Sequence, residues 1–352
     1  MELPILPPFN PMLAEPAAEV PRGDYLYEPE WDGFRALIFR DGAEIVIQSQ
    51  NQRPLERWFP ELVRALRSRL PRKVVLDGEI VVTGPHGLDF DALLLRIHPN
   101  DARVDKLARQ HPASFVACDL LALGAQDLRN HPLLRRRTAL EKALKKASPP
   151  VYVTPATTEV SVARGWLDRF EGGGLGGVLC KPLASVYESG RGGIMRVRLD
   201  RTAACVIGGY RIAKEGSGVA SLLLGLYDDI GVLQHVGVAT GIDGDTRVTL
   251  QNLLEPLRLG PEDPHPWLGA RDRSDIRVPG SGAGWTDDRH VGWQPVEPRM
   301  VALVQYDHMQ GDRFRHATHY QRLITDRDPR ACTFDQVVRH PVAEVTTLLR
   351  AS

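Results

Sequence analysis

Lysine is scarce in this chain of 352 residues. The sequence holds seven lysines against 37 arginines, and the first of them is Lys73. Any chemistry that needs a lysine amine is therefore confined to a few positions. The chain also has no formal net charge, because Lys and Arg total 44 and Asp and Glu total 44. A chain this balanced can bind a nucleic-acid backbone only if its positive charge is concentrated on one face.

Long apolar runs and metal-type cysteine spacings are absent as well. No stretch approaches the roughly 20 apolar residues that span a bilayer. The start Met1-Glu2-Leu3-Pro4 lacks the basic and apolar regions of a signal peptide. We therefore expect a cytoplasmic protein without a membrane partner. The cysteines have no ligand spacing, and we expect buried thiols at Cys118, Cys180, Cys205 and Cys332.

The first part of the chain predicts a mixture of helices and strands. Residues 37–40 and 44–47 are apolar and flank Asp41-Gly42, which predicts a hairpin. Apolar residues at helical spacing predict a helix over residues 60–70 that Pro71 ends, followed by a buried strand over residues 74–82. A second helix is predicted over residues 134–146, and the glycines at 172–174 predict a loop.

The pattern changes near residue 202. Between residues 204 and 238, short β-branched and leucine-rich runs alternate with turn residues, which predicts a small antiparallel barrel. Residues 260–294 are rich in Gly, Pro, Asp and Arg and predict a long surface loop. We therefore expect two domains, at residues 1–202 and 203–352, from a length of 352 residues with 43% hydrophobic content.

Residues 28–35 read Glu-Pro-Glu-Trp-Asp-Gly-Phe-Arg. This segment resembles the nucleophile motif Lys-x-Asp-Gly-x-Arg of ATP-dependent DNA ligases, with Glu30 where the lysine is expected. Four later segments resemble other ligase motifs in the same order: residues 75–79, 115–120, 176–181 and 195–198. Residues 306–332 resemble the end of the small bacterial two-domain, LigC-like ligases, so the resemblance covers nearly the whole chain.

The resemblance implies an α+β fold. Residues 1–202 would form the nucleotidyltransferase (adenylation) domain, an ATP-grasp-like ligase core. A β-barrel OB-fold domain would follow over residues 203–352. It also implies ATP and Mg²⁺ as cofactors, with a metal contact at Glu79. The nucleotide-binding positions that the resemblance assigns are Glu28, Arg35, Glu79, Lys181, Arg196 and Arg198.

Five positions depart from the ligase pattern in ways that remove chemistry. A covalent nucleotidyltransferase uses a lysine amine to attack the α-phosphate, and Glu30 has no amine. At about 4 Å and a dielectric near 20, exchanging that cation for an anion costs very roughly 8 kcal/mol beside a phosphate. The other four positions lose a phosphate-binding arginine, a stacking aromatic, a metal carboxylate and a pyrophosphate-orienting arginine; they are Gln50, Cys118, Gly176 and Ile324.

Three functions are compatible with these residues. The first is a ligase homologue in DNA repair that does not adenylate itself and binds nicked or broken duplex DNA, or scaffolds repair proteins or an active ligase. The second is a working ATP-dependent ligase, or one that performs only the final step on nicks already adenylated. The third is a protein-interaction or nucleotide-sensing module that does not bind DNA. A DNA-bound form would associate with the nucleoid.

The DNA-binding alternatives need a basic face. Two arginine-rich stretches are candidates for it, at residues 64–73 and at Arg135-Arg136-Arg137, although both are also compatible with ordinary solvated helix faces. The sequence does not determine the oligomeric state.

Overall fold

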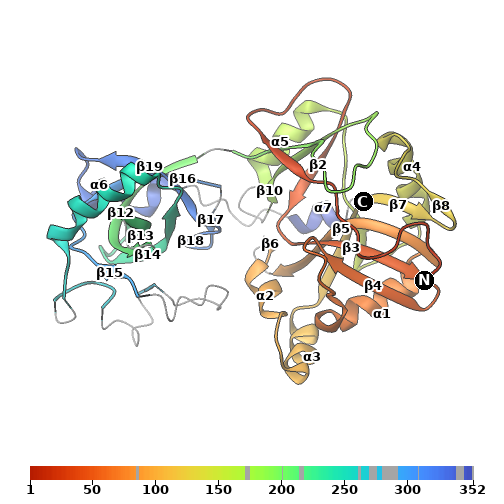
Figure 1. The fold of residues 1–352 in the computed structure, drawn as a ribbon, viewed down its shortest axis with the longest axis horizontal. Coiled ribbons are helices and arrows are strands. Elements are labelled where there is room, and N and C mark those ends of the chain that lie inside the picture. Colours follow the sequence, from red (N-terminus) through yellow and green to blue (C-terminus); the bar gives the residue numbers. More distant parts are fainter. Residues whose placement is uncertain are drawn as a thin grey trace. The chain divides into compact units, whose positions relative to one another are not determined.

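In the computed structural model, the chain forms two compact units (Figure 1). Residues 1–199 and 340–352 belong to the first unit, and residues 200–339 form the second. The structure describes residues 1–84, 87–170, 175–199, 201–213, 218–260, 263–268, 276–279, 292–307, 309–337 and 345–350. The division lies within a few residues of the predicted boundary, but the last thirteen residues belong to the first unit.

A twisted sheet organises the first unit. Its described strands follow the order β4-β3-β5-β7-β8, while β6 pairs with β5 and β9 pairs with β7. The strands are β3 (Phe34–Asp41), β4 (Glu44–Ser49), β5 (Lys73–Gly84), β6 (Gly87–Leu88), β7 (Ala113–Leu123), β8 (Gln126–Asp127) and β9 (Val151–Val153). The predicted hairpin is confirmed, because Asp41 pairs with Glu44 across a turn in which Gly42 has a φ of 62°.

Helices cover one face of this sheet. Leu62 and Leu66 of α1 and Leu140 of α4 pack on Ile38, Leu76 and their neighbours. The predicted helices and the buried strand are confirmed; α1 has Pro60 in its first turn and ends where Leu70 becomes extended before Pro71. The helices of this unit are η1 (Glu56–Trp58), α1 (Pro60–Arg69), α2 (Phe90–Leu95), α3 (Asp101–Gln110), α4 (Leu133–Leu144), α5 (Val160–Phe170) and α7 (Val345–Arg350).

A second sheet packs against the opposite face. Its order is β1-β11-β10-β2, and β2 pairs antiparallel with β10. Leu37 and Phe39, which alternate with the helix-facing Ile38, pack with Leu179 and Ile194 of this sheet. The strands are β1 (Ala14–Ala17), β2 (Tyr25–Trp31), β10 (Leu175–Pro182) and β11 (Ile194–Val197). The two sheets therefore enclose an apolar layer, and the polar residues of β2 and β10 lie beside it.

The second unit is a closed barrel. Its strands follow the order β13-β14-β19-β16-β12, and β12 pairs with β13 to close the ring. The β14–β19 pair is parallel and the other pairs of the ring are antiparallel. The strands are β12 (Arg201–Ile212), β13 (Val219–Tyr227), β14 (Leu233–Thr240), β16 (Val301–Tyr306) and β19 (Thr318–Ile324). This closed five-stranded arrangement is that of an OB-fold, which confirms the predicted barrel.

Shorter elements complete the second unit. Helix α6 (Gly244–Leu254) follows β14, and Asp243 caps its N-terminus by accepting a hydrogen bond from Thr246 N. The others are η3 (Glu255–Leu257), β15 (Gln294–Pro295), β17 (Met309–Gln310), β18 (Arg313–Phe314), η4 (Pro329–Ala331) and η5 (Phe334–Gln336). Much of the predicted loop at 260–294, and the predicted loop at 172–174, lie outside the described residues.

The predicted basic face is wrong at two arginines. Arg136 and Arg137 are buried rather than solvated, and each pairs with a carboxylate inside the first unit. Burying an unpaired guanidinium would be costly, so these side chains belong to the interior network. Arg64, Arg67 and Arg72 remain exposed. All four cysteines are buried free thiols, as expected.

No helix among the described residues is both long and apolar enough to cross a membrane.

Candidate functional site

The candidate site of the first unit is built on strands β2 and β10. Glu28 and Glu30 are two residues apart on β2, so their side chains leave the strand on the same side. Across the pair, Glu28 lies opposite Leu179 and Glu30 opposite Gly177, beside an irregularity in the register. The sheet therefore places Glu28 next to Lys181, and Glu30 next to Arg198, which follows β11.

Glu30 is held by arginines. Its Oε1 lies 2.7 Å from Nη2 of Arg198 and its Oε2 lies 2.9 Å from Nε of the same guanidinium. Nη1 of Arg196 is 3.8 Å from Oε1. Arg198 thus binds Glu30 with both prongs of its fork, the geometry in which an arginine binds a carboxylate most firmly. A carboxylate fixed in this way is a counter-ion.

Glu28 forms a second, fully buried pair. Nζ of Lys181 donates to its Oε2 at 2.6 Å, and Arg137 approaches its Oε1 at 3.5 Å. Burial by itself disfavours the ammonium of Lys181, but Glu28, together with Cys118 and Asp119, outweighs burial and raises the pKa of Lys181. Lys181 is therefore a protonated ammonium at neutral pH, and it has no lone pair with which to attack.

Arg35 is committed to an aspartate of β5, the neighbouring strand of the same sheet. Its Nε and Nη2 each donate to Asp77 at 2.6 Å, and the hydroxyl of Tyr187 donates to the same carboxylate at 2.6 Å. Burial disfavours the charged guanidinium, yet Asp77 raises the pKa of Arg35 well above its usual value. Tyr187 lies between β10 and β11 of the second sheet, so its hydrogen bond to Asp77 links the two sheets.

Glu79, the predicted metal contact, lies in a poor setting for an anion. Burial raises the pKa of Glu79 well above its usual value; Arg35 opposes that rise, whereas Asp77, Glu30 and Asp32 add to it. A carboxyl that holds its proton is a weak ligand for Mg²⁺, which prefers ionised oxygen. Among the residues that the structure describes, no group of three or more His, Cys, Asp or Glu side chains is placed to hold a metal ion.

Gly176 and Gly177 explain how Glu30 is accommodated. A Cβ at Gly176 would lie 3.2 Å from Oε2 of Glu30 and 3.3 Å from Nη2 of Arg198. At Gly177 it would lie 2.3 Å from the carbonyl oxygen of Val197, which no Cβ tolerates. A side chain at position 176 would crowd the Glu30–Arg198 pair, so Gly176 leaves this pair room without displacement.

The other predicted positions are placed as follows. Cys118 is buried in β7, and burial together with Glu28 raises the pKa of its thiol to about 12, so it is an inert thiol next to the Glu28 pair. The side chain of Gln50 is exposed in the turn after β4. Ile324 ends β19 in the second unit, pairs with Val301 and packs on the barrel core.

Three partners in this network were not predicted from the sequence. Asp77 and Tyr187 hold Arg35, and Arg137 holds Glu28. A signal for Asp77 was present, since it is a charged residue inside an otherwise apolar strand run and such a residue needs a buried partner. Nothing in the local sequence distinguishes Arg137 from its exposed neighbour Arg135.

Comparison with known proteins gives matches along nearly the whole length. Residues 11–196 match the family model described as "ATP dependent DNA ligase domain", and residues 215–327 match "ATP dependent DNA ligase C terminal region". The chain is 45% identical to DNA ligase C2 of Mycolicibacterium smegmatis over 99% of this chain and 100% of that protein. It is 44% identical to DNA ligase C of Mycobacterium tuberculosis over 96% of each.

A solved structure shares the fold. It is described as "DNA binding with a minimal scaffold: Structure-function analysis of Lig E DNA ligases", and it is similar with a TM-score of 0.53 and 16% identity. The match covers 90% of this chain and 99% of that one. A likeness at this identity supports the two-part α+β and barrel architecture alone.

Proposed function

Because the chain belongs to the ATP-dependent DNA ligase family, we propose that it is a ligase homologue of DNA repair that does not adenylate itself. In place of sealing, it binds nicked or broken duplex DNA or scaffolds repair proteins. The observation that carries this proposal is the fork of Arg198 on Glu30, with atoms 2.7 and 2.9 Å apart.

The chemistry of adenylation fails at this residue. Charging a ligase requires an amine lone pair that attacks the α-phosphate, forms a P–N bond and expels pyrophosphate. The nucleophile position carries a carboxylate, and that carboxylate neutralises the arginine that would otherwise face phosphate. A carboxylate could in principle form a mixed anhydride, but Glu30 is fixed against Arg198 and points its lone pairs at the guanidinium.

Lys181 is not a substitute nucleophile. It is buried, its Nζ lies 2.6 Å from Glu28, and the paired carboxylate raises its pKa. Attack would require breaking this pair and deprotonating an ammonium that the pair stabilises. The next lysine along the chain in either direction is Lys146 or Lys214.

The family is ATP-dependent, which implies ATP and a divalent metal. The positions expected to hold phosphate are engaged within the protein: Arg198 with Glu30, and Lys181 with Glu28. At Glu79, the expected metal contact, burial raises the pKa of the carboxyl, which disfavours the ionised form that a metal prefers. These residues do not fit a metal-bound triphosphate, and we derive no step through it.

The scaffold of a DNA-binding ligase is nevertheless retained. A Cβ at Gly33 would lie 2.3 Å from the carbonyl oxygen of Ile80, so the Asp-Gly turn of the motif is required by packing as well as by chemistry. We assign the adenylation-type domain to residues 1–202 and the OB-fold domain to the residues from 203 onward, except that residues 340–352 belong to the first unit. Nucleotide contact at Glu28, Arg35, Glu79, Lys181, Arg196 and Arg198 stays a proposal, and it requires internal pairs such as Glu28–Lys181 and Glu30–Arg198 to open.

The decisive functional assay uses three duplexes of one sequence: intact, nicked with a 5′-phosphate, and nicked with a pre-adenylated 5′ end. We expect preferential binding of the nicked duplexes, weakening steeply with salt because phosphate contacts release counterions. We expect no sealing of the phosphorylated nick with ATP and Mg²⁺ or Mn²⁺.

The same assay separates the alternatives. Sealing of the phosphorylated nick would show an active ligase, as the names of the related ligases suggest. Sealing of the pre-adenylated nick alone would restrict the activity to the final step. Equal and salt-insensitive binding of all three duplexes, or none, would favour a protein-interaction module.

A further inference from the structure

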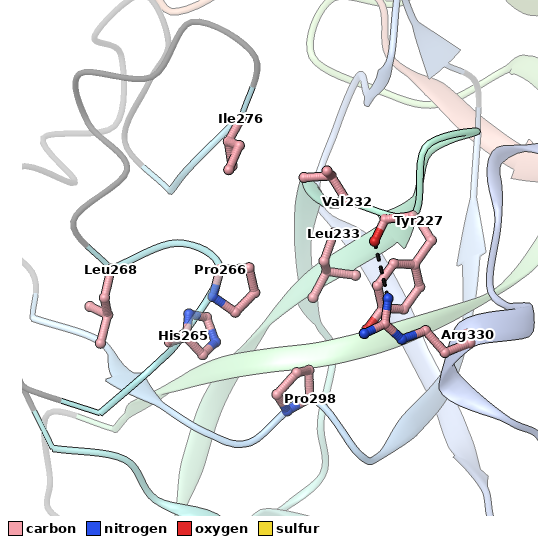
Figure 2. A pocket seen from close by; sticks show the side chains of 10 residues that line it. Tyr227, Val232, Leu233, His265, Pro266, Leu268, Ile276, Pro298 and Arg330 are labelled. Carbon is pink, nitrogen blue, oxygen red and sulfur yellow. Dashed lines mark hydrogen bonds between the residues drawn. The ribbon is translucent and has the colours of Figure 1, made fainter.

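The second unit carries a cavity of about 480 Å³ that the ligase site does not use (Figure 2). It lies where the turn between β13 and β14 meets the segment 265–268 and Arg330 of η4. Its described lining includes four aliphatic side chains and two prolines: Val232, Leu233, Leu268, Ile276, Pro266 and Pro298. The proline rings are rigid, so this wall loses little entropy when a ligand orders it.

His265 adds a neutral wall. Its Nε2 lies 2.9 Å from the carbonyl oxygen of Gly208, and its Nδ1 accepts a hydrogen bond from Trp267 N at 3.1 Å. One ring nitrogen donates and the other accepts, which is the pattern of an uncharged imidazole. Burial also lowers the pKa of His265, which favours the same uncharged form. The histidine therefore contributes a ring surface and no positive charge.

Arg330 supplies the positive charge at the rim. Its guanidinium lies 4.5 Å from the ring centre of Tyr227, and its Nη1 donates to the carbonyl oxygen of Gly231 at 3.1 Å (Figure 2). Among the ten described residues that line the cavity, none is Asp or Glu. The neighbouring Asp328 carboxylate accepts from the backbone of Arg330, at 2.9 Å. An exposed guanidinium fixed over an aromatic ring keeps donors available for an external carboxylate.

An exposed apolar residue stands beside this cavity. Oδ1 of Asp228 accepts from the backbone nitrogens of Ile230 and Val232, which holds the turn in shape. Within that turn the side chain of Ile230 is 79% exposed. An isoleucine held outward next to an apolar cavity extends the apolar surface, as is usual where proteins bind one another.

From this arrangement we propose that the cavity docks an acidic peptide segment of a partner protein. A bulky apolar side chain of the segment enters the cavity, and an adjacent aspartate or glutamate binds Arg330. The proposal deepens the scaffolding role and rests on it. A nucleic-acid ligand fits less well, since a polyphosphate needs several cations and the face of Tyr227 is already covered by Arg330.

The test is fluorescence anisotropy of the full chain with a labelled, C-terminally amidated peptide, Gly-Asp-Glu-Leu-Phe-Asp-Glu-Gly. Three matched peptides accompany it. One has lysine in place of every acidic residue, one has serine in place of leucine and phenylalanine, and one lacks acidic residues but keeps a free C-terminal carboxylate. We expect saturable binding of the first peptide and at least tenfold weaker binding of the other three.

Protein variants locate the site. Arg330→Gln removes the carboxylate contact and Ile276→Glu places a charge in the cavity; each should weaken binding at least tenfold. Arg322→Gln, an exposed arginine elsewhere in the barrel, should leave binding unchanged. Equal binding of the acidic and lysine peptides, preference for the free C-terminus, or no binding at all would each overturn the proposal, and these peptide comparisons need no variant to fold. Nick sealing by the chain would refute the proposed function without altering this result, and failure of the peptide would leave the Glu30 argument intact.

Discussion

In the first unit, eight of the buried side chains among the described residues carry a formal charge, whereas the described part of the second unit buries no Asp, Glu, Lys or Arg. The barrel is held by aliphatic and aromatic packing, with neutral polar groups such as His265 inside it. The ligase-like unit instead holds pairs such as Glu28–Lys181 and Arg35–Asp77.

The difference shows what remains when chemistry at a site changes. A buried charge cannot be lost alone, because its partner would be left uncompensated in the interior. Glu30 pairs with Arg198, and Gly176 leaves them room. In the first unit, a change at one charged residue therefore requires a compensating change at its partner. In the barrel, the effect of a substitution depends mainly on the apolar volume that it removes.

The largest effect is expected from breaking a buried pair. Arg136 binds Asp119 through two atoms at 2.9 Å each. Arg136→Met should lower the free energy of unfolding in urea by about 3–5 kcal/mol because Asp119 is left buried and unpaired. The exposed neighbour provides the control, and Arg135→Met should change it by less than about 0.5 kcal/mol.

A double variant sharpens that result. Adding Asp119→Leu to Arg136→Met removes the stranded charge, so part of the lost stability should return. If Arg136→Met cost no more than its control, the contrast between the units would fail.

The barrel should respond to lost volume. Leu224 of β13 is fully buried in its core. Leu224→Ala should cost about 2–5 kcal/mol in the second unit, with little dependence on pH or salt. Ile230→Ala, at a side chain that is 79% exposed, should be nearly neutral. A salt-dependent loss at Leu224 would show that the barrel core is not held by apolar packing alone.

Glu79 allows the buried charges of the first unit to be tested through the pH dependence of stability. Its pKa is raised by burial, so the folded chain holds this proton more tightly than the unfolded chain. The stability that the protonated group contributes is full below the unfolded pKa and is lost as pH rises through the folded pKa. Glu79→Gln should therefore flatten this fall, leaving the variant more stable than wild type at pH 8. The measurement is the free energy of unfolding in urea for both proteins from pH 4 to 9. The same pH dependence in the two proteins would contradict this prediction.

The smallest effect concerns one backbone position. Gln52 has a φ of 59°, a conformation that favours glycine. Gln52→Gly should raise the melting temperature, corresponding to about 1 kcal/mol of relieved strain. Gly42 has a φ of 62° with nothing near its Cβ position, so Gly42→Gln is the matched control and should lower stability by a similar amount. If neither variant changed the stability, backbone strain at these positions would be excluded as an explanation.

Much of the fold was predictable because its signals are local. The hairpin at Asp41-Gly42, helix α1 before Pro71 and the alternating strands of the barrel follow from turn residues and periodicity. The β12–β16 and parallel β14–β19 pairs of the barrel join strands far apart in the sequence, so the specific OB-fold came from the resemblance rather than from local pattern.

The site was less predictable because its pairings join distant residues. Motif positions located Glu28, Glu30 and Lys181, but the partnership of Glu28 with Lys181 spans 153 residues and nothing local encodes it. The two buried arginines of α4 were misassigned for the same reason, since local charge gives no information on burial. The return of the C-terminal helix α7 to the first unit also depends on tertiary packing of Leu349.

The most direct test of the central claim is the intact mass of the purified chain after incubation with ATP and Mg²⁺ or Mn²⁺. A chain whose Glu30 is fixed on Arg198, and whose Lys181 is a paired ammonium, should keep its mass unchanged. The Glu30→Lys variant should also gain no AMP under the same conditions, because Gln50, Cys118, Gly176 and Ile324 still depart from the ligase pattern. A gain of one AMP by the wild-type chain would contradict the account and show that another side chain acts as the nucleophile.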